Sequence, residues 1–359
     1  MAKKAAARKE RPAQAPRRGR AAAPKRSAKG VPRRAAAPER SLEDLDRAGA
    51  EAFRRGSFAD AAVAYAGILD RLAAAGPPDD AEGARLQGEI EVRHAAALRR
   101  AGKLVDAKRI AERSIATASE SPDVHAAAHI VLSELHLLAG NRPLAKLSAD
   151  VAGAASAGID GPISAWALAA QGRLLWSQQS HEDASQAFMQ AYNLCRRHAD
   201  YANAAIAAGS VGMCLMEVGR LPDARNWVGR AAEEAREAEI PAVEAAWTVG
   251  LARVALAEGA PDEAARLAEA GLAIAQPLGL HLTIFRAEWL RHYLVTLAEP
   301  GVVDRARMAV LRKLKPALAD YTGDREVQDL LATLAPKGRP AERVASFTDG
   351  CDPVPFPTA

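Results

Sequence analysis

Cysteine is scarce in this chain of 359 residues, which contains three: Cys195, Cys214 and Cys351. None of them stands in a CxxC pair or another paired spacing. Neither a disulfide framework nor a zinc site is therefore expected. Such sparse cysteine usage fits a reducing compartment, and we expect a cytoplasmic protein.

Long apolar runs are also lacking. No stretch approaches the eighteen or so consecutive apolar residues that a membrane-spanning helix needs. The chain begins with positive charge, but no apolar segment follows as a secretory signal requires. An organelle transit peptide is a weaker alternative, because no Leu, Ile or Phe precedes Val31 to give the segment an apolar face. We therefore expect no membrane partner.

Signatures of catalysis are missing as well. The sequence has no glycine-rich phosphate loop, no HExxH and no GxSxG. His125 and His129 are one helical turn apart and could share a zinc ion, but His136 lies about 10 Å further along the same expected helix. Core or interface histidines are therefore favoured over a metal site. We expect no enzyme, no metal and no cofactor.

Alanine and an uneven charge distribution are what the chain has in abundance. Apolar residues make up 49% of it and aromatic residues only 4%, which favours closely packed helices because alanine has the highest helix propensity. Residues 1–40 contain fourteen Lys or Arg against two acids, a net charge of +12. The remaining 319 residues have a net charge of −8. A basic arm thus precedes an acidic body.

One pattern recurs along this body. A small residue is followed by a Gly seven positions later, a bulky residue two further on, and an Ala five after the Gly. In the first copy these residues are Gly49, Gly56, Phe58 and Ala61. The aligned alanines are separated by 46, 38, 39, 40, 40 and 42 residues, and they are Ala61, Ala107, Ala145, Ala184, Ala224, Ala264 and Ala306. A period of this size indicates a solenoid.

Each copy is expected to form a helical hairpin. The small residue lets two helices approach, the Gly allows a tight turn, and the Ala lies where the second helix crosses the first. Seven hairpins would stack into one continuous core. A longer loop from Gly76 to Asp80 explains the first spacing, and the charged segment from Asp324 to Leu334 is expected to be a final helix that shields the last hairpin.

This pattern resembles the tetratricopeptide repeat family. The resemblance rests on the spacing above and on Tyr65 and Phe188, which stand four residues beyond the Ala where that family commonly has a bulky residue. The departures are a period near 40 in place of about 34 and alanine at most of the bulky positions. The resemblance implies an all-α, right-handed superhelical solenoid of antiparallel helix pairs over residues 41–335. Residues 1–40 and 336–359 are expected to be disordered.

In that family the first helix of each hairpin lines a concave groove. Aromatic, Met and Arg side chains are typical of binding hot spots, and a non-catalytic protein–protein scaffold or adapter is therefore predicted, with a partner segment in the groove. For each tryptophan the alternative is that it fills a gap between alanine-rich helices. The inward-facing positions transferred onto this register are Phe53, Arg99, Arg100, Trp166, Arg173, Trp176, Met213, Met216, Arg253 and Arg291.

The basic arm supports an alternative function. A charge of +12 over forty residues is enough to bind DNA or RNA through counterion release, without sequence preference. The protein would then be a nucleic-acid-tethered regulator whose repeats recruit another protein. The arm could equally be a solubilising linker that folds back on the acidic body. The residues expected to contact nucleic acid are Arg17, Arg18, Arg20, Lys25, Arg26, Arg33 and Arg34.

Overall fold

A computed structural model describes residues 41–299 and 304–318. The predicted basic arm, the expected final helix from Asp324 to Leu334 and the C-terminal tail from residue 336 lie outside the described residues. In the described ranges the helices are joined by short turns and loops, and there is no strand. None of their helices combines the length and apolar character that crossing a membrane requires.

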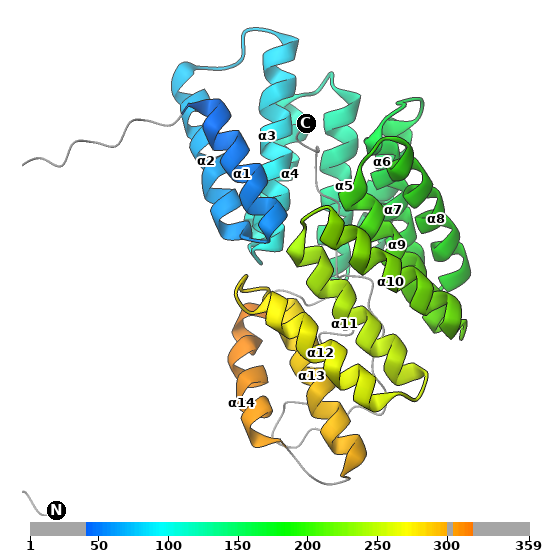
Figure 1. Ribbon diagram of the computed structural model, residues 1–359. Helices are drawn as coiled ribbons and strands as arrows, with labels where there is room; N and C mark the ends of the chain where they lie inside the picture. Colours follow the sequence, from blue (N-terminus) through cyan, green and yellow to red (C-terminus); the bar gives the residue numbers. More distant parts are fainter. Residues whose placement is uncertain (1–40, 300–303, 319–359) are drawn as a thin grey trace, which may run out of the picture. The chain divides into compact units, whose positions relative to one another are not determined.

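Fourteen α-helices and one short 3-10 helix make up the described chain (Figure 1). They are α1 (Leu42–Arg55), α2 (Phe58–Ala75), α3 (Ala81–Arg100), α4 (Leu104–Thr117), α5 (Pro122–Leu138), α6 (Arg142–Ser156), α7 (Pro162–Ser177), α8 (His181–Arg197), α9 (Tyr201–Glu217), α10 (Leu221–Glu237), α11 (Pro241–Ala257), α12 (Pro261–Ala275), α13 (His281–Ala298), α14 (Arg305–Leu314) and η1 (Lys315–Leu318).

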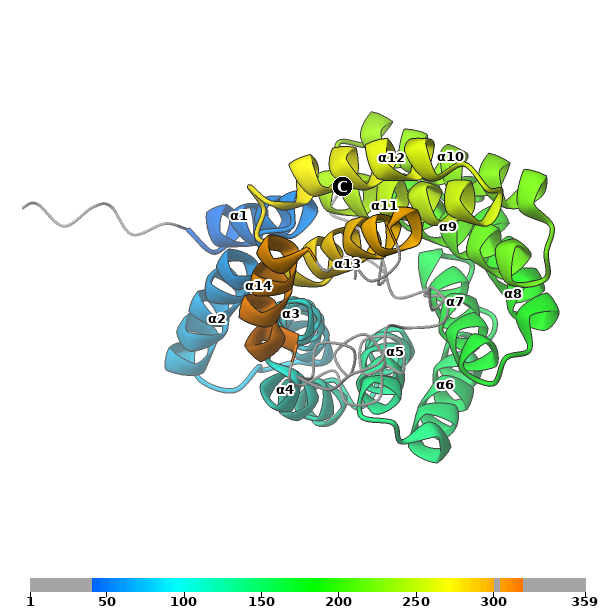
Figure 2. The ribbon, with the colours of Figure 1, turned by 90° about the horizontal axis from the view of Figure 1, so that it is seen from below.

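Consecutive helices pair into seven hairpins, from α1 with α2 to α13 with α14. From α3 to α13, each odd-numbered helix also contacts the next odd-numbered helix. The odd-numbered helices α3 to α13 therefore form an inner layer, and the even-numbered helices α4 to α12 lie outside them (Figure 2). The repeat architecture predicted from the sequence is confirmed.

The small residues of the repeat allow close helix packing. A Cβ atom on Gly49 would lie 2.8 Å from the ring of Tyr65, and one on Gly172 would lie 2.8 Å from the ring of Phe188. Both bulky residues are therefore matched by a glycine on the facing helix. The copies with alanine or serine on the inner helix have alanine on the outer helix, which explains the departures from the family pattern: Ala95 and Ala111, Ser133 and Ala149, Ala252 and Ala268.

The seventh hairpin departs from the register. The six aligned alanines from Ala61 to Ala264 are completely buried, whereas Ala306 is exposed. The other outer helices begin three residues before the aligned alanine, but α14 begins one residue before it. Ala306 therefore lies in the first turn, and Met308 and Leu311 are buried in its place. The prediction that Ala306 marks a helix crossing is wrong.

Contacts between hairpins distant in sequence close the stack. A Cβ atom on Gly56, which ends α1, would lie 3.0 Å from the Cβ of Ala242 in the first turn of α11. It would also lie 3.1 Å from the side chain of Leu280, the residue that precedes α13. The first hairpin thus contacts the sixth and the start of the seventh. Similarly, the Ala317 carbonyl oxygen in η1 lies 3.9 Å from the Cβ position of Gly102, between α3 and α4.

Candidate functional site

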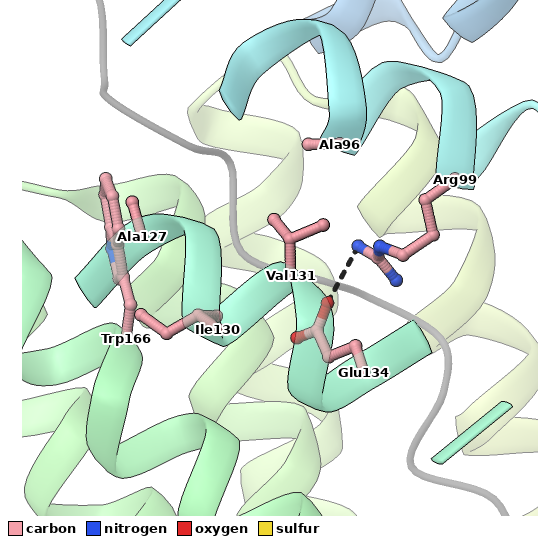
Figure 3. A pocket seen from close by; sticks show the side chains of 7 residues that line it. All are labelled: Ala96, Arg99, Ala127, Ile130, Val131, Glu134 and Trp166. Atoms are coloured by element: carbon pink, nitrogen blue, oxygen red, sulfur yellow. Dashed lines mark ion pairs between the residues drawn. The ribbon is translucent and has the colours of Figure 1, made fainter. Parts of the chain in front are cut away.

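Three neighbouring inner helices surround a small hollow (Figure 3). Its volume is about 10 Å³, which is room for about one water molecule. Isoleucine, valine and tryptophan side chains form one part of its wall, and a charged pair forms another (Figure 3). The lining residues are Ala96 and Arg99 from α3, Ala127, Ile130, Val131 and Glu134 from α5, and Trp166 from α7.

Glu134 joins the three helices through ion pairs. One of its carboxylate oxygens lies 3.0 Å from Nη2 of Arg99 on α3, and the other pairs with Nη2 of Arg173 on α7. All three side chains are at most 5% exposed. The Nε atom of Arg173 has no hydrogen-bond partner among the described residues. Removing charges from water costs several kcal/mol per ion, so burying these three charged side chains opposes folding through a large desolvation free energy.

Buried hydrogen bonds fix the orientation of Trp166. Its indole Nε1 donates to the carboxylate of Asp200 at 2.8 Å, and the side-chain nitrogen of Asn203 donates to the same oxygen at 2.7 Å. Asp200 also caps the N-terminus of α9 through the backbone of Asn203. Burial raises the pKa of Asp200, and the bonds from Asn203 and Trp166 partly oppose that rise. The start of α9 therefore holds the ring that lines the hollow.

Three further residues predicted from the sequence lie near turns between helices. Phe53 is buried, and its ring meets that of Phe58 edge to face at 5.2 Å. The guanidinium of Arg100 lies 4.4 Å from the centre of the Phe58 ring. Trp176 is partly buried against the core and meets the ring of His181 edge to face at 4.6 Å.

The remaining predicted residues are on the last inner helices. Met213 on α9 is fully buried, Met216 is partly buried, and Arg253 on α11 is 4% exposed. Arg291 on α13 lies 3.6 Å from a carboxylate oxygen of Glu288. The structure thus brings Arg99, Trp166 and Arg173 together at one place. It spreads the other seven over six odd-numbered helices: Phe53 on α1, Arg100 on α3, Trp176 on α7, Met213 and Met216 on α9, Arg253 on α11 and Arg291 on α13.

Sequence reasoning missed Glu134 and Asp200. The repeat register contained a signal for the first of them. Glu134 stands six residues before the turn residue Gly140, which is the position that Arg173 occupies before Gln179. An acid and a base at the same position of successive repeats are candidates for an ion pair. Asp200 had no such signal, because its role depends on which way the Trp166 ring turns.

The histidines of α5 are partly buried. His125, His129 and His136 each keep some solvent exposure. Burial lowers the pKa of His129 and of His136. Within residues 41–299 and 304–318, no three His, Cys, Asp or Glu side chains are grouped so that they could hold a metal ion.

Comparison with known proteins identifies the fold. No family model matches the sequence, and no curated protein matches it. A Rap protein, solved in complex with Competence and Sporulation Factor, matches the structure with a TM-score of 0.58 at 12% identity, over 82% of this chain and 90% of that one. The apo form of RapI matches with a TM-score of 0.50 at 10% identity, over 82% and 79% of the two chains.

A tetratricopeptide repeat protein from Parabacteroides merdae is also similar, with a TM-score of 0.37 at 13% identity, over 77% of this chain and 98% of that one. The likeness to the two Rap proteins, at identities this low, indicates a shared fold alone. The chain has a tetratricopeptide-repeat-like helical-repeat fold, and the resemblance found in the sequence is confirmed.

Proposed function

We propose that this tetratricopeptide-repeat-like solenoid is a non-catalytic scaffold that binds a segment of a partner protein along its inner layer. One observation carries the proposal: the buried cluster of Arg99, Glu134 and Arg173 lies on three successive inner helices, and the first two line the hollow with Trp166. Arg and Trp are the side chains that most often dominate binding energy at protein interfaces.

Stacking of the hairpins does not by itself account for these charges. In the same register α9 has Met213 where α7 has Arg173, and α9 packs against both of its inner neighbours. Apolar residues of similar size at such positions are often neutral or stabilising compared with a buried ion pair. The charges therefore favour a role in recognition, and the hollow supplies an adjoining apolar contact.

The structural neighbours are consistent with ligand binding. A Rap protein with a similar fold was solved in complex with Competence and Sporulation Factor. For this chain we propose a partner segment that carries carboxylates beside an apolar side chain, because Arg99 lines the hollow together with Ile130 and Trp166, and Arg173 pairs with Glu134 of the same wall.

Selection from a displayed library of random 12-residue peptides tests this site. We expect enriched peptides to bind the full chain and to lose about tenfold in affinity, equal to 1.4 kcal/mol, when Arg173→Met is introduced. This variant keeps the side-chain volume and leaves Glu134 paired with Arg99. Arg230→Met, on outer helix α10, is the matched control and should bind as the wild type does.

Circular dichroism of both variants checks that helicity is unchanged. Enriched peptides that bind the Arg173→Met variant as tightly as the wild type would place recognition elsewhere and exclude the proposed site.

A second function is supported by the charge of the sequence. The +12 of residues 1–40 favours nucleic-acid binding through counterion release. Duplex DNA titrated at several salt concentrations should bind the full chain with a steep salt dependence. Replacing the seven arm residues with Gln should reduce the affinity and flatten the salt dependence. If both proteins bind duplex DNA with equal affinity, or if neither binds it, this function is contradicted. The replaced residues are Arg17, Arg18, Arg20, Lys25, Arg26, Arg33 and Arg34.

The cytoplasmic location and the domain boundaries stay predictions. If residues 41–335 form the folded domain, limited proteolysis of the full chain should first cut within residues 1–40 and 336–359. Early cuts between two of the described hairpins would contradict these boundaries.

A further inference from the structure

Outer helix α6 carries a row of apolar residues on its solvent-exposed side. Leu144 is 40% exposed and Leu147 is 59% exposed. Ala154 is also exposed, and Val151 is partly buried. These four residues are spaced i, i+3, i+7 and i+10, so they lie along one side of the helix. We call them the α6 stripe, and it lies away from the core residues of α6, such as Ala149.

The α6 stripe is not a feature of the repeat. In the other five outer helices of the first six hairpins, the residue before the aligned alanine is acidic. The helix dipole favours an acid in the first turn. Helix α6 has Leu144 at this position and no acid in its first turn. Packing within the repeat therefore does not explain this leucine. The acids are Asp60, Asp106, Asp183, Asp223 and Glu263.

Leu147 departs from the repeat in the same way. Two residues after the aligned alanine, the outer helices α4, α8, α10 and α12 have Arg109, Gln186, Asn226 and Arg266. A contiguous row of exposed apolar side chains, unlike a single one, favours contact with another protein surface. Helix α6 packs on the inner helices α5 and α7 and belongs to the outer layer (Figure 2). Another helix can therefore approach the stripe from outside.

The α6 stripe matches itself when a second copy is turned around. Leu144 and Ala154 are equally far in sequence from Ala149, and so are Leu147 and Val151. A two-fold axis at the level of Ala149, perpendicular to the helix, makes the two α6 helices antiparallel. It places Leu147 of one copy against Val151 of the other, and Leu144 against Ala154. A two-fold interface requires this kind of self-complementary patch.

The charges beside the stripe match as well. Lys146 and Asp150 are exposed on one flank of α6, and their side chains pair at 2.6 Å within the chain. Across such a two-fold axis the same flanks of the two helices meet. Asp150 of the second copy then lies about 3 Å along the axis from Lys146 of the first. Each lysine can therefore pair with the aspartate of the other copy, which gives the apolar centre a polar rim.

We propose that the chain forms a two-fold dimer through antiparallel pairing of α6 with α6 of a second copy. The α6 stripe forms the centre of the interface, and Lys146 and Asp150 form its rim. A contact through one helix per copy buries less than about 1,200 Å², so the dimer is weak, with a Kd on the order of 10–100 μM. The dimer goes beyond the proposed function, because the inner layer of both copies stays open to a partner.

Sedimentation equilibrium of the full chain, at up to several hundred micromolar, measures this association. Salt at about 0.5 M screens the attraction between the basic arm and the acidic body. We expect a monomer–dimer equilibrium that Leu147→Glu weakens by at least about tenfold, because the substitution is present twice in a two-fold interface. Val63→Glu on α2 is the matched control: Val63 has the same register position and is 73% exposed. It should dimerise as the wild type does.

Cysteine cross-linking tests the antiparallel arrangement. In a Cys351→Ser background, Cys195 and Cys214 are buried and should not react. A mixture of the Leu144→Cys and Ala154→Cys variants should form a covalent dimer with a short bis-maleimide. Neither variant should do so alone, because equivalent residues of the two copies are about 15 Å apart along the axis.

Three results would overturn the proposal. The first is a chain that stays monomeric at these concentrations. The second is a dimer that Val63→Glu dissociates and Leu147→Glu leaves intact, which would place the interface on α2. The third is cross-linking of either cysteine variant alone, which would mean that the helices pair in parallel. Circular dichroism of each variant checks that a lost dimer does not result from unfolding.

Discussion

At the scale of single residues, a close approach between inner helices depends on Gly209 of α9. The indole of Trp247 on α11 is completely buried. A Cβ atom on Gly209 would lie 2.1 Å from Cε2 of that ring, and the ring is too rigid to yield locally. We expect Gly209→Ala to destabilise the protein by about 2–3 kcal/mol, in the range measured for overpacked cores. Urea unfolding followed by circular dichroism measures it.

Gly229→Ala on α10 is the control for that substitution. Nothing lies within 4 Å of its Cβ position, so replacing a glycine inside a helix should stabilise by about 0.5–1 kcal/mol. Equal effects at Gly209 and Gly229 would show that helix propensity, and not the contact with Trp247, governs both positions.

His94 on α3 makes stability depend on pH. Burial, aided by Arg113 and Arg109 and opposed by Asp106 and Asp70, lowers the pKa of His94 to about 4. Between pH 6.5 and about 4 the unfolded chain therefore binds a proton that the folded chain does not. The free energy of unfolding should fall as the pH is lowered through this window. Because the imidazole is only partly buried, we expect its share to be about 1 kcal/mol.

Thermal unfolding of the wild type and of His94→Gln at pH 7 and pH 5 measures this share. The difference in melting temperature between the two pH values should be smaller in the variant. Identical differences in the two proteins would mean that other groups cause the dependence.

At the scale of the elements, the turns inside the first six hairpins, all of which the structure describes, obey the repeat pattern with one exception. Gly56, Gly102, Gly140, Gly219 and Gly259 all have positive φ, and Gln179 takes the same place with a φ of 65°. A residue with a Cβ is disfavoured in that left-handed region. We expect Gln179→Gly to stabilise the turn between α7 and α8, by about 1 kcal/mol.

The reverse substitution gives a matched test. Gly219 has a φ of 80° and no atom within 4 Å of its Cβ position, so Gly219→Gln changes the backbone preference without a clash. It should destabilise by a similar amount in thermal unfolding. A stabilising or neutral effect of Gly219→Gln would contradict the role of the backbone angle.

The elements also show how far the sequence predicts the fold. The alanine period, the turn glycines and the small residues were enough to predict seven hairpins, because each depends on packing inside one repeat. The exposure of Ala306 was not predictable in this way, since it depends on where α14 begins. Contacts between repeats were harder still: the pairing of Glu134 with Arg99 and Arg173 depends on the spacing of three inner helices, which no single repeat encodes.

At the scale of the whole helical unit, the contact between α1 and α11 joins hairpins that are far apart in the sequence. Terminal repeats of a solenoid have a neighbour on one side only and are therefore its least stable part. Here the first hairpin has a second neighbour through Gly56 and Ala242. We expect Ala242→Arg to break this contact and to speed amide hydrogen exchange in α1 and α2.

Ala202→Arg is the control, because Ala202 is the second residue of α9 as Ala242 is of α11. It should leave exchange in α1 and α2 unchanged. If Ala242→Arg also leaves it unchanged, the contact does not stabilise the first hairpin.

The contact of Gly56 with Ala242 and Leu280 also restricts how the number of repeats can change during evolution. An open repeat array can gain or lose a unit by unequal recombination and still stack, because every unit needs only its neighbours. In this chain the loss of one unit of about 40 residues between α3 and α10 would move Ala242 and Leu280 away from Gly56. Relatives that keep the contact should therefore differ by substitutions and loop lengths but share the same copy number.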